Sequence, residues 1–248
     1  MAENSNSEKA PVLILGAGKN IGLSLAKRFV ADEIPVIISY RSKPDDAVTL
    51  QLENPDLVKG CFALDASTPL TIERFFKQVH ESTNTLSALI NCIGPFMQKS
   101  LSETSTDSFD RIIYGNLNQS FNCAIKALPF LKNNGGGSII QFTFAGVEKL
   151  SAYSLSAAYA ASKAGLLSLI RSMSVEWAKD NITVNAIAPG LTEIVPQSQQ
   201  HLFKDIPSGH PVSLEDIYKT TEFLLSENAR HLTGTNLTVS GGFGWKYP

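Results

Sequence analysis

Short apolar runs alternate with amphipathic segments along most of this chain. The runs Val12–Leu15, Val36–Tyr40 and Ala88–Asn91 are almost wholly apolar, which is typical of strands buried on both faces. Similar runs predict four further strands, at Cys61–Leu64, Ser138–Phe142, Thr183–Ala188 and Asn236–Val239. Between these runs, apolar residues recur at helical spacing and predict helices over residues 21–29, 72–79, 107–131 and 157–177, with a last helix beginning after Ser213.

Strands that alternate with helices and are apolar throughout predict a parallel sheet covered on both faces. Right-handed crossovers then give the fold class, which is α/β: a single doubly wound, Rossmann-type domain with a seven-stranded parallel sheet and helices on both faces. No linker or repeat divides the sequence. We therefore expect a flexible N-terminal tail over residues 1–10 and one domain over residues 11–248.

Two segments stand outside this regular alternation. Pro129 lies inside the long predicted helix and can break it, because proline removes a backbone donor. Residues 191–212 have no clear period and contain three prolines, so they predict either a functional lid or a plain variable surface loop. After this loop, Ser213 and Asp216 have the spacing of a helix N-cap and its capping box.

Composition limits the classes of function. The chain has 248 residues, of which 43% are hydrophobic, and its net charge is −2, which does not favour nucleic acid as a partner. No apolar run reaches the roughly 18 residues of a membrane span, and the polar N-terminus does not resemble a signal peptide. Three widely spaced cysteines and four scattered histidines predict reduced thiols, a cytoplasmic location and no metal site.

A glycine-rich turn follows the first predicted strand. Gly16 and Gly18 allow a tight turn that brings backbone N–H donors to a pyrophosphate, and Gly22 lets the next helix lie close to the strand. A strand before the turn and a helix after it are the context that a dinucleotide site requires. The sequence therefore predicts such a site, the alternative being a simple strand-to-helix bend.

The tip of the second strand indicates which dinucleotide would bind. An NAD site carries an acidic residue about 20 residues after the glycines, whereas this strand ends in Arg41 and Ser42. A guanidinium and a hydroxyl can bind a 2′-phosphate, and Lys19 in the turn adds positive charge. We therefore predict NADP(H) as the cofactor; the alternative is that Arg41 and Lys19 are merely solvated.

Tyr159 and Lys163 lie four residues apart in a predicted helix and share one of its faces. A free tyrosine has a pKa near 10, and a neighbouring ammonium lowers that pKa. Tyr159 could then donate the proton that must accompany hydride transfer to a C=O or C=N bond, while Lys163 also binds the nicotinamide ribose. A pair at this spacing is weak by itself, but its place in a helix after the fifth predicted strand strengthens it.

Taken in order, these motifs resemble the short-chain dehydrogenase/reductase family over nearly the whole chain. The matching pieces are Gly16-x-x-x-Asn20-Ile21-Gly22, Leu64-Asp65-Ala66, Asn91-Cys92-Ile93-Gly94, Asn116, Tyr159-x-x-x-Lys163, Pro189-Gly190 and Val239-Ser240-Gly241-Gly242. The resemblance implies that Asp65 binds the adenine amino group, that Asn116 holds a water linked to Lys163, and that Pro189-Gly190 flanks the nicotinamide. The predicted cofactor-binding residues are thus Gly16, Gly18, Lys19, Asn20, Ile21, Gly22, Arg41, Ser42, Asp65, Ala66, Asn91, Cys92, Ile93, Gly94, Tyr159, Lys163, Pro189 and Gly190.

Within the family, the chain is most similar to pteridine and dihydromonapterin reductases, through Leu15–Gly22, Pro35–Ser42 and Tyr159–Ala164. The resemblance implies an aromatic that stacks on the pterin, and Phe96 falls at that place; loop packing or a generic apolar wall is the alternative. The family also implies a homodimer or homotetramer. The small residues of the helix over 157–169 could pack against a partner or inside the core.

One departure from the family pattern bears on the chemistry. Phe144 stands where the family has a catalytic serine, or an aspartate in pteridine reductases, and the loop after it is longer. Phenylalanine cannot hydrogen-bond a substrate carbonyl. Either Thr143 or a serine of the following loop (151, 154 or 156) substitutes, or the site lacks one polarising donor. A milder departure is Asn20 in place of a glycine, which pteridine reductases share.

The sequence as a whole predicts an NADPH-dependent oxidoreductase that reduces a C=O or C=N bond of a small substrate, with a pterin as one candidate. The alternatives are a 3-oxoacyl or general ketone reductase, or a weakly active NADP(H)-binding sensor or partner-binding protein. The predicted catalytic residues are Tyr159, Lys163 and Asn116, and the predicted substrate contacts are Phe96, Thr143, Phe144 and Tyr159. Trp245 and Tyr247 are expected only as aromatics that could reach a neighbouring subunit.

Overall fold

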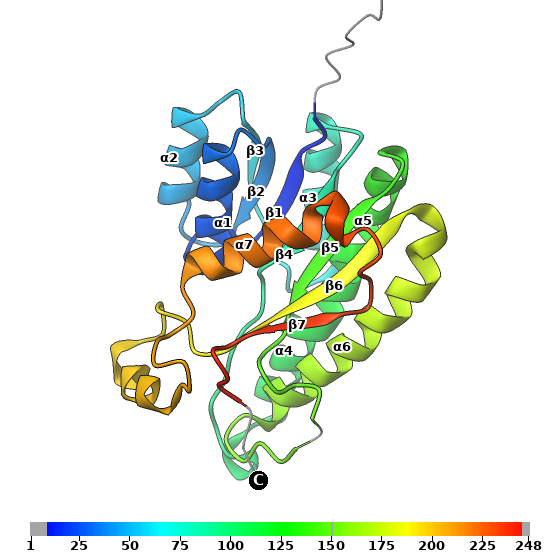
Figure 1. Ribbon diagram of the computed structural model, residues 1–248. Coiled ribbons are helices and arrows are strands. Elements are labelled where there is room, and N and C mark those ends of the chain that lie inside the picture. Colours follow the sequence, from blue (N-terminus) through cyan, green and yellow to red (C-terminus); the bar gives the residue numbers. More distant parts are fainter. Residues whose placement is uncertain (1–8, 150, 245–248) are drawn as a thin grey trace, which may run out of the picture.

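A single parallel sheet forms the centre of the molecule in a computed structural model that describes residues 9–149 and 151–244 (Figure 1). Its strands are β1 (Val12–Leu15), β2 (Val36–Tyr40), β3 (Val58–Ala63), β4 (Ala88–Asn91), β5 (Gly137–Phe142), β6 (Ile182–Pro189) and β7 (Asn236–Val239). They pair in the order β3-β2-β1-β4-β5-β6-β7, and every pair is parallel. The predicted α/β fold class, with seven parallel strands in one doubly wound sheet, is confirmed.

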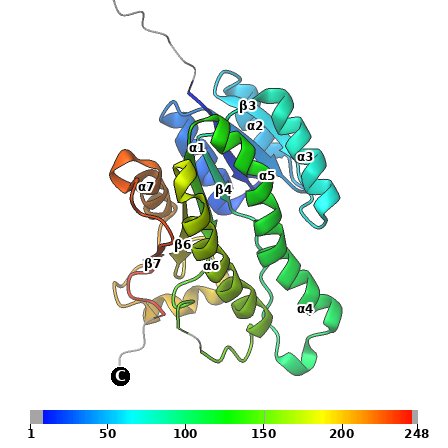
Figure 2. The same cartoon turned by 90° about the vertical axis from the view of Figure 1, so that its right-hand side faces the viewer.

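Helices cover both faces of the sheet (Figures 1 and 2). One face carries α1 (Asn20–Ala31), α2 (Asp45–Glu53) and α7 (Leu214–Leu225), and the other carries α3 (Pro69–Ser82), α5 (Gln119–Asn133) and α6 (Ala157–Trp177). Each face has its own buried apolar cluster, which explains why the central strands β1 and β4 are buried along their whole length. The continuous apolar runs of the sequence are therefore the consequence of two-sided burial.

The strand order reverses between β1 and β4, which are neighbours in the sheet although β2 and β3 lie between them in the sequence. Connections leave β1 and β4 in opposite directions at this point, and sheets of this kind bind ligands in the crevice beyond the carboxyl ends of such strands. The glycine turn follows β1 and the segment Asn91–Gly94 follows β4. The fold thus brings these two predicted segments to one edge of the sheet.

Two elements differ from the sequence-based prediction. The short helix α2 was not predicted, because only Ala47 and Leu50 of its residues are buried and two positions give no clear helical period. Strand β3 begins at Val58, earlier than the predicted Cys61, because exposed Lys59 interrupts the apolar run.

The long predicted helix is interrupted, but not at Pro129. It consists of α4 (Thr106–Ile113), a π-helical turn at Tyr114–Asn118 and α5, which continues through Pro129 to Asn133. The expected break near Pro129 was therefore wrong. Proline removes only one backbone donor, and here it lies one turn from the end of the helix. The π-turn instead interrupts the regular repeat at the position that carries Asn116.

The segment 191–212 is an ordered loop whose two ends are joined by backbone hydrogen bonds. The N–H of Val212 donates to the carbonyl of Leu191 and the N–H of Glu193 donates to the carbonyl of Val212, both at 2.9 Å. Between them lies a 3-10 helix at Gln197–Asp205, which projects away from the sheet at the lower left of Figure 1. The helix that follows has the predicted capping box, with Ser213 and Asp216 bonded reciprocally.

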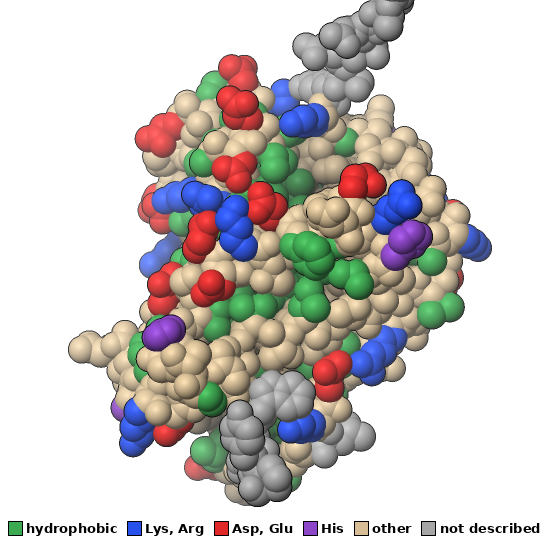
Figure 3. All heavy atoms as spheres, viewed as in Figure 1, with side chains coloured by type: hydrophobic (Ala, Val, Ile, Leu, Met, Phe, Trp, Pro, Cys, Tyr) green, Lys and Arg blue, Asp and Glu red, His purple; other side chains and the backbone are tan. Residues whose placement is uncertain are grey.

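Charged side chains of both signs are interspersed on the face shown in Figure 3, and no stripe of one sign crosses it. No helix within the described residues is long and apolar enough to cross a membrane. Most of the predicted tail over residues 1–10 lies outside the described residues, as do Trp245 and Tyr247.

Candidate active site

The glycine turn after β1 is held against β2. Gly16 has φ +80°, in the left-handed region that favours glycine, and its N–H donates to the hydroxyl of Ser39 at 3.0 Å. A Cβ on Gly22 would lie 2.4 Å from the carbonyl oxygen of Gly16, so only glycine lets α1 begin this close to β1. Asn20 has φ +53°, a conformation that asparagine tolerates better than most residues. This explains why it can replace a glycine.

Sequence analysis missed Ser39, which is 1% exposed inside the otherwise apolar β2. Its carbonyl also accepts from the N–H of Ala17 at 2.6 Å, so one residue fixes two backbone groups of the turn. A buried hydroxyl in an apolar strand is unusual enough to have been a signal.

The segment after β4 lies above a buried polar network. The side chain of Asn91 donates to Gln141 at 3.0 Å, and its oxygen accepts from the N–H of Ile93 at 3.1 Å. Gln119 donates to the carbonyl of Ile93 at 3.2 Å. Because Ile93 faces the Gly16 turn, with 3.2 Å between its Cγ1 and a Cβ built on Gly16, this network positions one wall of the crevice. The two glutamines were also missed from sequence.

Lys163 points into this crevice from α6 and is 4% exposed. Its ammonium donates to the carbonyl of Phe142, at the end of β5, at 2.7 Å. Burial lowers the pKa of Lys163 from 10.5 to about 8, while the negative charge of an ionised Cys92 acts in the opposite direction. Burial also raises the pKa of Cys92 to about 12, with Lys163 opposing the shift.

Asn116 is brought beside Lys163 by the π-turn. Its side-chain nitrogen donates to the carbonyls of Pro95 and Ile112 at 2.9 and 3.0 Å, and its Oδ1 is buried without a partner in the protein. A Cβ on Gly94 would lie 2.7 Å from that oxygen and 3.1 Å from the ammonium of Lys163. The absence of a side chain at Gly94 therefore keeps two polar groups open to the crevice.

Tyr159 lies one turn before Lys163 and contacts two phenylalanine rings. Phe96 meets it edge-on, with ring centroids 5.0 Å apart and planes at 86°, and Phe144 lies at 5.7 Å and 32°. Burial raises the pKa of Tyr159 to about 12. The predicted lowering of this pKa by Lys163 is therefore outweighed by burial. The ammonium is 5.7 Å from the ring centroid and is bonded to Phe142, so desolvation dominates.

Thr143 does not supply the donor that Phe144 lacks. Its hydroxyl donates to Asn236 of β7 at 2.6 Å, and the residue is 4% exposed. The side chain therefore joins two strand ends. The expectation that Thr143 contacts the substrate conflicts with this bonding.

The predicted 2′-phosphate contacts lie together at the surface. Arg41, Ser42 and Lys19 are exposed. A Cβ on Gly18 would lie 3.1 Å from both the carbonyl of Lys43 and the Cβ of Tyr40, so the glycine turn touches the tip of β2. The missed helix α2 places two exposed acidic residues, Asp45 and Asp46, just beyond this tip.

The remaining predicted contacts are farther along the same edge. The carboxylate of Asp65 accepts from the N–H and hydroxyl of Ser67, at 3.2 and 2.9 Å, and Ala66 is buried beside it. Gly190 donates to the carbonyl of Val239, and a Cβ on Gly190 would lie 2.8 Å from Ser240 Cβ. Ser240 therefore packs directly against Gly190.

The residues of the crevice fit a dinucleotide. The glycine turn offers backbone donors without obstructing side chains, and cationic side chains lie beside it. At the other end, the buried ammonium of Lys163 and the unpartnered oxygen of Asn116 can bind hydroxyl groups. No cluster of three metal-ligating side chains occurs within residues 9–149 and 151–244.

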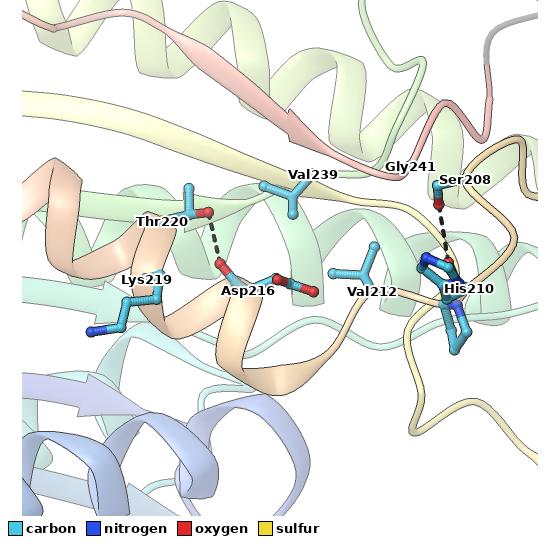
Figure 4. A pocket seen from close by; sticks show the side chains of 9 residues that line it. Ser208, His210, Val212, Asp216, Lys219, Thr220, Val239 and Gly241 are labelled. Carbon is cyan, nitrogen blue, oxygen red and sulfur yellow. Dashed lines mark hydrogen bonds between the residues drawn. The ribbon is translucent and has the colours of Figure 1, made fainter.

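A second cavity, of about 410 Å³, lies between the base of the 191–212 loop, α7 and β7 (Figure 4). Its lining includes Ser208, His210, Asp216 and Lys219, and it contains none of the predicted site residues. Asp216 already caps α7, so this cavity does not present a free helix N-terminus. The candidate active site is the crevice and not this cavity.

Comparison with known proteins identifies relatives of the whole chain. Residues 16–244 match the family model described as enoyl-(acyl carrier protein) reductase. The chain is 30% identical to a short-chain dehydrogenase/reductase of Armillaria gallica over 98% of both chains. It is 28% identical to the 3-oxoacyl-(acyl-carrier-protein) reductase MabA of Mycobacterium bovis, over 94% of this chain and 92% of that one. An acetoin dehydrogenase from Enterobacter cloacae has the same fold, with a TM-score of 0.85, 23% identity and 96% of each chain covered.

The buried ammonium gives a prediction for stability. The pKa of Lys163 is about 8 in the folded protein against an ordinary 10.5, so between these pH values the unfolded chain binds more protons. The contribution of Lys163 to stability should therefore rise with pH in this window, by up to about 1.4 kcal/mol per pH unit. Denaturant unfolding of wild type and Lys163→Met at pH 8 to 10 measures this as a rise with pH in the free energy of unfolding of wild type minus that of Lys163→Met. Lys27→Met, an exposed lysine of α1, is the control, and a difference that stays flat with pH would contradict the burial of the charge.

Proposed function

The chain belongs to the short-chain dehydrogenase/reductase family, whose members use a nicotinamide dinucleotide, and we propose that it is an NADPH-dependent reductase of a C=O or C=N bond in a small substrate. The observation that carries the proposal is the grouping of Tyr159, Lys163 and Asn116 at the end of the crevice between β1 and β4. A proton donor, a buried cation and a free acceptor lie there side by side.

The bound nicotinamide would supply the hydride, and the protein must supply the proton. A phenol with a pKa of about 12 is protonated at neutral pH, so Tyr159 is held in the state that a donor needs. Its proton passes to the oxygen or nitrogen of the substrate as the carbon is reduced. The ammonium of Lys163 then stabilises the phenolate that remains, and Asn116 Oδ1 can accept a hydrogen bond from a water or hydroxyl beside it.

NADP(H) is the proposed cofactor because of the charge at the tip of β2. Arg41 and Lys19 are exposed next to the glycine turn, and Ser42 can add a hydrogen bond to a phosphate. The acidic residues Asp45 and Asp46 begin α2 rather than ending β2, where a 2′-hydroxyl contact would be expected.

Two substrate classes have specific support. A pterin is supported by Phe96, whose ring is 58% exposed beside Tyr159 and can stack on a flat heterocycle. A 3-oxoacyl thioester is supported by the similarity to the mycobacterial 3-oxoacyl reductase. Phe144 and the bonded Thr143 leave fewer hydrogen-bond donors than a simple ketone reductase would use, which also keeps a weakly active NADP(H) sensor as an alternative.

We further propose a homodimer or homotetramer in the cytoplasm. All three cysteines are free thiols, as a reducing compartment requires. Phe121 and Ile125, one turn apart on α5, are exposed and could be covered by a partner. The small-residue face of α6 is partly used inside the chain, since Ala158 is buried and Gly165 packs on Leu117, whereas Ala161 is exposed.

Arg41→Ala should lower the affinity for NADPH by about 10- to 100-fold and leave the affinity for NADH nearly unchanged, because only NADPH carries the phosphate. Titration calorimetry with both cofactors measures the two affinities. Arg74→Ala, which removes an exposed arginine of α3 on the opposite face of the sheet, is the matched control and should behave as wild type. Equal preference for NADPH and NADH in wild type and Arg41→Ala would rule out the assignment.

Tyr159→Phe should reduce kcat/KM by about 10²- to 10⁴-fold while NADPH affinity changes little, because the ring and its packing remain and only the proton donor is lost. Turnover is followed by NADPH consumption with a dihydropterin, a 3-oxoacyl thioester and a simple ketone. The substrate with the highest kcat/KM decides between the two classes. Tight NADPH binding without turnover of any of them would favour the sensor.

A further inference from the structure

The two phenylalanine rings beside Tyr159 form a corner. Phe96 stands almost perpendicular to the ring of Tyr159, whereas Phe144 is tilted from it by only 32°. The faces of the two phenylalanine rings are therefore steeply inclined to each other. We call Phe96, Phe144 and Tyr159 the aromatic corner.

Phe144 is held rigidly in this corner. Tyr153 supports it edge-on, with ring centroids 5.4 Å apart and planes at 87°. The backbone on either side is anchored to β6, because Thr143 donates to the carbonyl of Ile187 at 2.9 Å and Ala145 donates to that of Pro189 at 3.0 Å. The ring is thus presented by a fixed strand end and not by a loose loop.

Two apolar side chains in the loops near the corner are exposed. Phe96 is 58% exposed and Leu155 is 50% exposed. The N–H of Lys99 donates to the carbonyl of Leu155 at 2.7 Å, which joins the loop after β4 to the loop before α6. The loop that carries Phe96 is therefore tied to the loop that carries Leu155, and each of the two loops exposes an apolar side chain.

This geometry favours flat groups. Aromatic pairs prefer offset-stacked or edge-to-face arrangements and gain about 0.5–1.5 kcal/mol beyond the area that they bury. A flat ring can lie against one phenylalanine and present its edge to the other, whereas a puckered or open-chain group cannot do both. Neither phenylalanine donates a hydrogen bond and Thr143 is already bonded to Asn236, so within this group Tyr159 is the donor to the reacting atom.

We propose that Phe144 is a specificity-determining residue that selects substrates whose reducible C=O or C=N bond belongs to, or is conjugated with, a flat unsaturated ring. Saturated and open-chain compounds of the same size are disfavoured. The inference rests on the proposed function for the site, but it concerns the shape of the ligand and not the reaction. It includes pterins and extends to neutral aromatic ketones, and it excludes aliphatic 3-oxoacyl chains as preferred substrates.

Acetophenone and cyclohexyl methyl ketone provide a matched pair, because they share the same carbonyl and number of carbons and differ in the flatness of the ring. Reduction of either consumes one NADPH and one proton and gives the secondary alcohol and NADP⁺. Wild type should favour acetophenone about tenfold, both in kcat/KM and in the dissociation constant from the NADP⁺-loaded protein measured by ligand-observed NMR.

Phe144→Leu and Phe96→Leu keep an apolar side chain but remove a flat one. Each should bring the acetophenone preference down by about three- to tenfold while the affinity for NADPH stays within twofold of wild type. Phe223→Leu, which changes an exposed phenylalanine of α7 outside the corner, is the control and should retain the full preference. If the two phenylalanines served only in packing, each variant would lower kcat/KM and binding affinity equally for both ketones. That result would overturn the proposal.

The two readouts separate this proposal from the proposed function. A flat-ring preference in binding that Phe144→Leu abolishes, without turnover of these ketones or of the dihydropterin and the 3-oxoacyl thioester, would support the corner and defeat the reductase. Reduction of both ketones without preference, or a preference that survives in Phe144→Leu, would defeat the corner and leave the reductase intact.

Discussion

The burial of one ammonium group, that of Lys163, is the constraint on which the rest of the site depends. The charge is 4% exposed, and its hydrogen bond goes to the carbonyl of Phe142. Such a group is costly unless further partners surround it, and the lowered pKa expresses that cost. The structure places the buried, unpartnered oxygen of Asn116 and the bare backbone of Gly94 next to it. The folded protein without cofactor therefore carries a polar centre that ligand hydroxyl groups can complete.

Several local features of the fold bring these groups together. The π-turn between α4 and α5 lets the Asn116 side chain bond the carbonyls of Ile112 and Pro95 and still leave its oxygen without a partner beside Gly94. The buried network around Asn91 sets the backbone of Ile93 against the glycine turn. A π-turn and a buried polar cluster are weaker solutions for stability than a regular helix and an apolar core. Their presence at one edge of the sheet is what a site of ligand binding would require.

The sequence predicted the architecture well because strands that are buried on both faces are apolar at nearly every position. Strands β1, β2, β4 and β7 and helix α6 have the predicted bounds. It failed at two elements: α2 buries too few residues to show a period, and the π-turn carries a side chain, Asn116, that bonds the distant carbonyl of Pro95. In the site, the motifs located Tyr159 and Lys163 but not Ser39 or the two glutamines. The role of a buried polar side chain depends on partners that are distant in the sequence. The direction of the Tyr159 pKa shift was misjudged because spacing along a helix says nothing of desolvation, which raises this pKa.

A crystal structure of the protein with NADP⁺ tests the central claim most directly. The account predicts the pyrophosphate on the Gly16 turn, the nicotinamide ribose within hydrogen-bonding distance of the Lys163 ammonium, and the Tyr159 hydroxyl facing the nicotinamide ring. A nucleotide bound elsewhere, such as in the cavity beside α7, or a Lys163 ammonium that makes no contact with the ribose of a nucleotide seated in the crevice, would contradict it.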